Sequence, residues 1–146
     1  MRILIDADGC PVVDITLRLA KKYGVECIIF CDTSHIFEKP GATTITCSQG
    51  ADSVDFALVN HARPGDIVIT QDYGLAGMCL ARKSAVFRQD GLEYTNDNIS
   101  SLLDSRHISQ KIRRAGGRLK GNKKRTQTED IAFEQALERY LESRLG

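Results

Sequence analysis

Arg2-Ile3-Leu4-Ile5-Asp6 is a short apolar run closed by an acid, and Ala7-Asp8-Gly9-Cys10-Pro11 then leads into a helical pattern. Proline suits the first position of a helix because the N–H that it lacks would have no partner there. Apolar residues at helical spacing continue to a glycine stop at Gly24, and residues 26–31 form a second apolar run. The order strand, helix, strand predicts a parallel pair of strands, the building unit of an α/β fold.

The rest of the chain extends this pattern. Three more strands and four more helices are expected, the strands at residues 43–47, 66–70 and 84–88 and the helices at residues 51–63, 73–83, 98–115 and 129–144. The turn signal Gln89-Asp90-Gly91 is typical of a hairpin, here with residues 92–95 as its second arm. Since no linker or repeat interrupts the pattern, residues 1–146 are expected to form a single domain.

The composition is that of an ordinary globular protein. The 146 residues are 42% hydrophobic and 27% charged, which is enough to bury one core. No apolar run approaches the roughly 20 residues of a membrane helix, so a cytoplasmic protein without membrane contact is expected. Five cysteines with no C-x-x-C pair argue against a disulfide framework or a structural zinc site. Cys10, close to two acids, is interpreted as a packing residue rather than a nucleophile.

Aspartates gather where the predicted strands end. Open α/β sheets bind ligands outside the carboxyl ends of their strands, near the point where the strand order reverses. Five aspartates follow the first, third and fourth strands and are predicted at this edge: Asp6, Asp8, Asp52, Asp55 and Asp72. Each taken alone is typical of a helix cap or a turn, so only their coincidence at three strand ends indicates a site. Asp66 begins its strand, which places it at the opposite edge as a turn residue.

The chemistry of such a cluster points to a metal. Carboxylates a few ångströms apart repel each other unless they are protonated, well solvated or bridged by a cation. Oxygen ligands without neighbouring histidines favour Mg²⁺ or Mn²⁺ over zinc. These ions suit phosphodiester hydrolysis, because they activate a water and stabilise charge on the leaving oxygen. The residues therefore suggest a divalent-metal-dependent nuclease.

A basic strip in the last third of the chain supports a nucleic-acid partner. Residues 106–125 carry nine lysines and arginines and no acid. Such clusters bind phosphates without reading sequence, although a solvated helix face is the alternative. RNA or another single-stranded nucleic acid is the expected partner, and its predicted contacts are Arg113, Arg114, Arg118, Lys120, Lys123, Lys124 and Arg125.

Ile5-Asp6-Ala7-Asp8-Gly9-Cys10-Pro11-Val12 resembles the opening Asp-Ala-Asp-Ala-Cys-Pro-Val of the YaiI/YqxD family of uncharacterised bacterial proteins. The resemblance continues through residues 65–76 and Tyr94-Thr95 to Asp130, and so covers nearly the whole chain. Glycine at position 9 in place of alanine, and Asn122 where proline is usual, depart from the family pattern.

This family is grouped with PIN-like domains, and the resemblance carries that grouping's fold and site. It implies a three-layer α/β/α sandwich with a mainly parallel five-stranded sheet, in the order 3-2-1-4-5, and extra C-terminal helices. It also implies an Mg²⁺ or Mn²⁺ site whose catalytic ligands are Asp6, Asp55 and Asp72. Asp8 and Asp52 are then supporting or alternate ligands.

Two other functions stay open at this point. Asp6-Ala7-Asp8-Gly9 also resembles the opening of haloacid-dehalogenase-type phosphohydrolases, in which the first aspartate is a nucleophile and the second a general acid or base. Thr33 or Ser34 would supply the hydroxyl that such enzymes need, but Asp66 precedes its strand and cannot complete their late acidic pair. The third reading is a non-catalytic nucleic-acid-binding module that uses only the basic strip. The sequence leaves the oligomeric state open.

Overall fold

The sheet is the centre of the molecule. The computed structural model describes residues 1–32, 38–48, 52–104 and 125–146. In these residues six strands form one sheet in the order β3-β2-β1-β4-β5-β6. The strands are β1 (Arg2–Asp6), β2 (Glu26–Asp32), β3 (Thr43–Cys47), β4 (Ile67–Ile69), β5 (Ala85–Phe87) and β6 (Glu93–Tyr94). The first five run parallel, in the order 3-2-1-4-5 that the family resemblance implied.

The five-stranded sheet that the resemblance implied is wrong by one strand, because the predicted hairpin arm forms β6, an antiparallel strand next to β5. The turn between them is closed by the N–H of Arg88 bonded to the carbonyl of Leu92 at 2.8 Å, and by Gly91 N–H bonded to Arg88 O at 3.0 Å. The fully buried Tyr94 anchors the short strand. The Gln89-Asp90-Gly91 turn signal therefore does mark a hairpin, and its second arm joins the main sheet.

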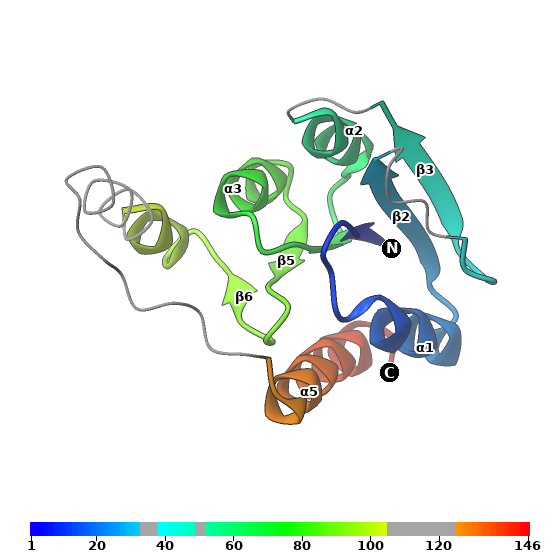
Figure 1. Ribbon diagram of the computed structural model, residues 1–146. Helices are drawn as coiled ribbons and strands as arrows, with labels where there is room; N and C mark the ends of the chain where they lie inside the picture. The colour runs from blue at the N-terminus through cyan, green and yellow to red at the C-terminus, as the bar shows by residue number, and fades with distance from the viewer. Residues whose placement is uncertain (33–37, 49–51, 105–124) are drawn as a thin grey trace.

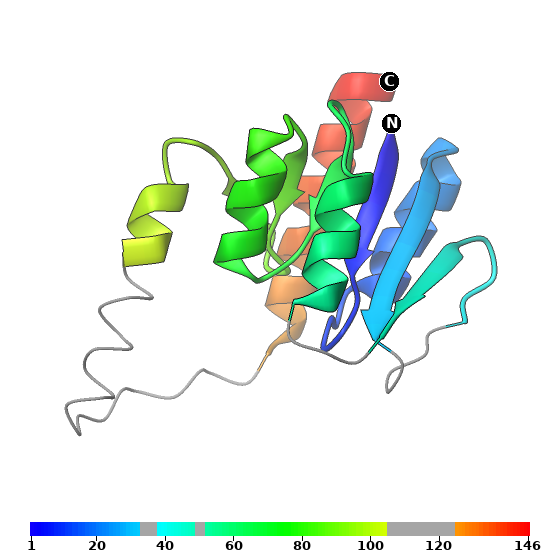
Figure 2. The same ribbon diagram turned by 90° about the horizontal axis from the view of Figure 1, so that it is seen from above.

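Helices cover both faces of the sheet and give it three layers (Figures 1 and 2). α1 (Val13–Tyr23) and α5 (Gln127–Leu145) lie on one face, whereas α2 (Ser53–His61) and α3 (Tyr73–Ala81) lie on the other. Residues 99–104 form a further helical segment, and the rest of the helix expected at residues 98–115 lies outside the described residues. The predicted three-layer α/β/α class is confirmed. None of the helices in the described parts of the chain has the length and apolar character needed to cross a bilayer.

Each face of the sheet has its own hydrophobic core. In β1, Ile3 and Ile5 pack with residues of α1 and α5, whereas Leu4 packs with residues of α2 and α3. All three side chains are fully buried. A parallel sheet covered on both sides needs apolar residues at every position, which explains why the strands are continuous apolar runs rather than alternating ones.

This topology creates the edge where a ligand is expected. β1 lies in the middle of the sheet, with β2 on one side and β4 on the other. The chain leaves β1 towards β2 and later returns to the other side of β1 with β4, so the strand order reverses between β1 and β4. Side chains that follow the carboxyl ends of these two strands therefore line the crevice in which open α/β sheets bind their ligands.

Candidate functional site

Asp6 and Thr70 join the two strands at the switch point. Asp6 ends β1, and Thr70 follows β4, the neighbouring strand. The Thr70 hydroxyl donates a hydrogen bond of 2.8 Å to Oδ2 of Asp6. The same hydroxyl oxygen accepts the backbone N–H of Asp72 at 3.0 Å. Since Thr70 is fully buried, it fixes Asp6 and the backbone of Asp72 relative to each other.

Asp72 also caps α3. Its Oδ1 accepts the N–H of Leu75 at 3.1 Å, in the geometry of a helix N-cap. Asp72 therefore has the helix-cap role that is typical of a lone aspartate. An ionised carboxylate has two oxygens with several acceptor positions, so a cap uses only part of its capacity. Asp72 can thus serve as a cap and also act as a ligand at this edge.

Asp8 is held by the end of the next strand. Its Oδ2 accepts the backbone N–H of Asp32 at 3.3 Å. Asp32 is the last residue of β2, beside β1 in the sheet. Asp32 is a further acid at this edge that the sequence analysis did not include, because it ended the strand at Cys31. The rule that placed Asp6, an acid closing an apolar run, would have found it.

Asp52 and Asp55 lie at the start of α2, at the same edge of the sheet. Asp52 occupies the N-cap position with φ of 68°, in the left-handed region, and its side chain makes no capping hydrogen bond. Aspartate is one of the few residues enriched in this backbone conformation. Asp55 lies in the first turn of the helix. Asp52 therefore lies at the predicted edge, and its side chain does not make the capping hydrogen bond that is typical of a lone aspartate at a helix start.

The five aspartates interact electrostatically. Burial raises the pKa of Asp6 to about 6, and the nearby charges of Asp55, Asp72 and Asp8 add to this rise, while the Thr70 hydrogen bond opposes it. Burial also raises the pKa of Asp55, and the charges of Asp72 and Asp52 add to it. Like charges that raise one another's pKa lie close together. The structure thus brings the five predicted site residues to one edge of the sheet.

The donor set fits a hard divalent ion in its chemistry. All of its side-chain ligands are carboxylate oxygens, as Mg²⁺ and Mn²⁺ prefer. Among the described residues, no three acids, histidines or cysteines are arranged around a common ion position. Mg²⁺ is commonly held by one or two carboxylates together with several waters and substrate oxygens. The arrangement therefore suits an ion held through a pair such as Asp6 and Asp72 rather than a closed protein cage.

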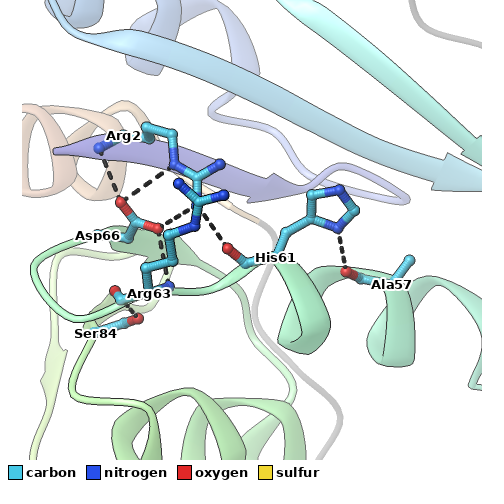
Figure 3. A network of polar contacts seen from close by, with 6 residues as sticks. All are labelled: Arg2, Ala57, His61, Arg63, Asp66 and Ser84. Atoms are coloured by element: carbon cyan, nitrogen blue, oxygen red, sulfur yellow. Dashed lines mark hydrogen bonds and ion pairs between the residues drawn. The ribbon is translucent and has the colours of Figure 1, made fainter.

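Asp66 lies at the opposite edge, as its position before β4 predicts (Figure 3). It is almost fully buried and pairs with Arg2, whose Nη2 is 2.7 Å from Asp66 Oδ2. The backbone N–H groups of Arg2 and Arg63 also donate to its carboxylate, at 3.1 and 3.0 Å. Arg2 further donates to the carbonyl of His61 at 2.6 Å. Asp66 is thus a structural acid that ties the amino ends of β1 and β4 to the end of α2.

Cys10 and Arg125 complete the surroundings of the acids. Cys10 packs against the core between the sheet and α1, and burial raises the pKa of its thiol to about 11. A thiol with this pKa is protonated at neutral pH, in keeping with a packing role. Arg125 donates to the carbonyl of Gln89 at 2.6 Å and to Asp130 Oδ1 at 2.8 Å. The other six predicted nucleic-acid contacts lie outside the described residues: Arg113, Arg114, Arg118, Lys120, Lys123 and Lys124.

Fold and edge together define a class: a three-layer α/β protein with a cluster of aspartates at the carboxyl edge of its sheet. Within that class the chain belongs to the YaiI/YqxD family, because the model of that family, described as "Uncharacterized BCR, YaiI/YqxD family", matches residues 4–143. The family resemblance stated from the sequence is confirmed. The wider grouping with PIN-like domains stays an expectation.

Relatives of similar length share this family. A "UPF0178 protein" of Exiguobacterium sibiricum is 60% identical over 141 residues, which are 97% of this chain and 96% of the relative. A protein of the same name from Ruminiclostridium cellulolyticum is 51% identical over 137 residues, 94% of this chain and 90% of the relative. Another, from Lachnoclostridium phytofermentans, is 47% identical and covers 98% of both chains. No solved structure matches the chain.

Proposed function

We propose that this protein is a divalent-metal-dependent phosphodiesterase that cuts RNA or single-stranded nucleic acid at the carboxyl edge of its sheet. The observation that carries the proposal is the grouping of acids at this edge: Asp6 is largely buried, which raises its pKa, and the nearby charges of Asp55, Asp72 and Asp8 raise it further. A fold that brings four carboxylates together at a switch point does so at a cost in stability, and a bound cation offsets that cost. Membership of the uncharacterised YaiI/YqxD family gives no information on activity.

In the proposed site, Asp6 and Asp72 would hold the ion as a pair of carboxylates, and Asp55, Asp8 and Asp52 would lie beside it. When bound, Mg²⁺ or Mn²⁺ would activate a water for attack at phosphorus and would offset charge on the leaving oxygen. Thr70 holds the Asp6 carboxylate in place through its 2.8 Å hydrogen bond. With a pKa of about 6, Asp6 is mostly ionised at neutral pH and available as a ligand. The basic strip at residues 106–125 would contact substrate phosphates.

The first test is metal binding. Mn²⁺ at saturating concentration should raise the melting temperature of the wild type and leave the Asp6→Asn/Asp72→Asn double variant unchanged, because a ligand that binds only the folded state stabilises it. Glu26→Gln is the matched control, since Glu26 is an exposed acid that starts β2 and lies at the opposite edge. An unchanged melting temperature in both wild type and control contradicts the metal site.

The second test is activity. RNA, single-stranded DNA and small phosphomonoesters are incubated with Mg²⁺ or Mn²⁺, and cleavage of the oligonucleotides by the wild type and Glu26→Gln but not by the double variant is expected. Turnover of phosphomonoesters alone would favour the phosphohydrolase. Binding of RNA without cleavage, unchanged in the double variant, would leave a nucleic-acid-binding module.

A further inference from the structure

Phe56 is a large aromatic side chain left in solvent beside the acids. It is 60% exposed, more than any other large hydrophobic residue in the described part of the chain. It lies in the first turn of α2, where its N–H donates to the carbonyl of Asp52 at 2.9 Å. Neither hydrophobic cluster of the described residues includes Phe56, so its ring contributes little to the core.

The helix sets the direction of the ring. Leu58 is fully buried and faces the sheet, so Phe56, two residues earlier, lies on the outer side of α2. Phe56 directly follows Asp55 and lies one turn after Asp52, the N-cap residue, whose carbonyl accepts its N–H. Long side chains in helices point back towards the helix N-terminus, which for α2 is the edge that carries the aspartates. The ring of Phe56 therefore borders the acidic edge on its outer side.

The surroundings of Phe56 are mostly polar. Of its neighbours one turn away on the helix, Asp52, Ser53 and Asn60 are polar, and Val59 packs partly against the core. Protein interfaces bury contiguous apolar patches with aromatic centres, which this helix face does not provide. A single planar ring in polar surroundings suits a small planar ligand. Nucleobases are such ligands, and each presents a π-face to an aromatic ring.

We infer that Phe56 is a stacking platform for a nucleobase of the substrate, next to the phosphate that a metal ion would bind at the aspartates. This inference rests on the proposed function and narrows its substrate class. Bases of a duplex are already stacked on one another, so only an unpaired strand offers a free face to Phe56. The platform selects single-stranded substrates without reading their sequence, since stacking is tolerant of base identity.

Binding is tested with an oligouridylate RNA, using Ca²⁺ in place of Mg²⁺ to slow cleavage. Phe56→Ala and Phe56→Leu should each weaken binding by about 5- to 100-fold, because leucine keeps apolar area but lacks a ring face. Phe56→Tyr should bind like the wild type. An oligomer of the same length without bases should bind all four proteins equally. Melting temperatures should agree among them, because the side chain is exposed.

A spectroscopic readout reports contact directly. The chain contains no tryptophan, so Phe56→Trp introduces a single tryptophan, whose emission can be excited apart from that of the four tyrosines. Its emission should be quenched by the RNA and not by the base-free oligomer. Leu145→Trp is the control, since Leu145 is 48% exposed at the far end of α5 and its emission should not respond.

The outcomes separate the two proposals. RNA binding by the wild type that is equal in Phe56→Ala overturns the stacking platform and leaves the proposed function standing. A wild type that neither binds nor cleaves any oligonucleotide overturns both. Emission of Phe56→Trp that changes with protein concentration, and not with RNA, identifies a second copy of the chain as the occupant and also overturns the platform.

Discussion

The Thr70 hydroxyl donates to Asp6 Oδ2 at 2.8 Å and accepts the N–H of Asp72 at 3.0 Å, so one buried oxygen connects the two aspartates that flank the switch point. Asp6 ends β1 and Thr70 follows β4, the neighbouring strand, and the two residues lie 64 positions apart in the chain. The bond favours the ionised form of Asp6, against the burial and the three neighbouring carboxylates that favour the protonated form. Whether Asp6 is ionised therefore depends on opposing effects, and pH, mutation and a bound cation each change their sum.

Replacing Thr70 by valine removes both hydrogen bonds without changing the volume of the side chain. The metal-free variant should lose about 1.5–3 kcal/mol of stability above pH 7, because a hydrogen bond to a charged group is removed. Below pH 5 the loss should be smaller, since Asp6 is then protonated. Urea unfolding at the two pH values measures both, with Thr70→Ser, which keeps the hydroxyl, as the control. An equal loss at both pH values would mean that the bond does not act on the Asp6 charge.

Asp6 should make the metal-free protein less stable as pH rises. Its folded pKa of about 6 lies above the ordinary value of 3.8, so between these values the folded state binds more protons than the unfolded state. Stability then falls with rising pH across this window, by up to about 3 kcal/mol, and stays level above it. Comparing urea unfolding of the wild type and Asp6→Asn from pH 3.5 to 8 isolates this contribution. A difference between the two proteins that does not vary with pH would contradict the raised pKa.

Mn²⁺ affinity should change with pH in the opposite sense. A cation competes with the proton for Asp6, so affinity should increase as pH rises from 5 to 7 and become constant above that. Isothermal titration calorimetry in buffers of different ionisation enthalpy should detect protons released at pH 5.5 and few at pH 8. Affinity that is constant over this range would remove Asp6 from the ligand set.

Asp66→Ala should be strongly destabilising and leave the acidic edge intact. The Asp66 carboxylate accepts four hydrogen bonds from Arg2 and Arg63, and the Asp66 and Arg2 side chains are only 5% and 15% exposed. Removing one partner of a buried ion pair costs about 3–5 kcal/mol. Asp90→Ala, which breaks the half-exposed pair with Arg88, should cost about 1 kcal/mol or less. Mn²⁺ affinity of the folded Asp66→Ala protein should equal that of the wild type, and a large decrease would place Asp66 in the site after all.

Gly91→Ala should separate α5 from the hairpin. Gly91 has φ of 94°, and a Cβ there would lie 2.7 Å from the carbonyl oxygen of Ala132 in α5. Gly65→Ala is the matched control, since Gly65 has φ of 88° and open space around the added carbon. Gly65→Ala should lower the free energy of unfolding by about 1–2 kcal/mol, because alanine is strained in the left-handed region. Gly91→Ala should lower it by about 1–3 kcal/mol more, because the added Cβ overpacks against α5. If thermal unfolding shows the same loss of stability in both variants, α5 moves away from the added Cβ at no cost in free energy.

Local signals in the sequence were sufficient for most of the elements. The run Arg2–Asp6, the glycine stop at Gly24 and the β-branched segment Thr43–Cys47 all agree with the structure, because strand and helix patterns depend on neighbouring residues. The five-stranded sheet that the family resemblance implied was short by one strand, although the turn signal at residues 89–91 predicted the hairpin whose second arm is β6. The strand order came from a family resemblance, as order depends on contacts between segments far apart in the chain.

For the acidic edge, too, some features follow from the sequence and others from the tertiary structure. The sequence by itself determined which aspartates follow strands, and so which ones can meet at the carboxyl edge, because parallel strands end on the same side. Only the tertiary structure decided that Thr70 bonds Asp6, that Asp32 holds Asp8 and that Asp66 pairs with Arg2. These contacts join residues 24 to 64 positions apart, and their geometry depends on strand register and burial. Burial also sets the pKa of Asp6, which no pattern of neighbouring residues specifies.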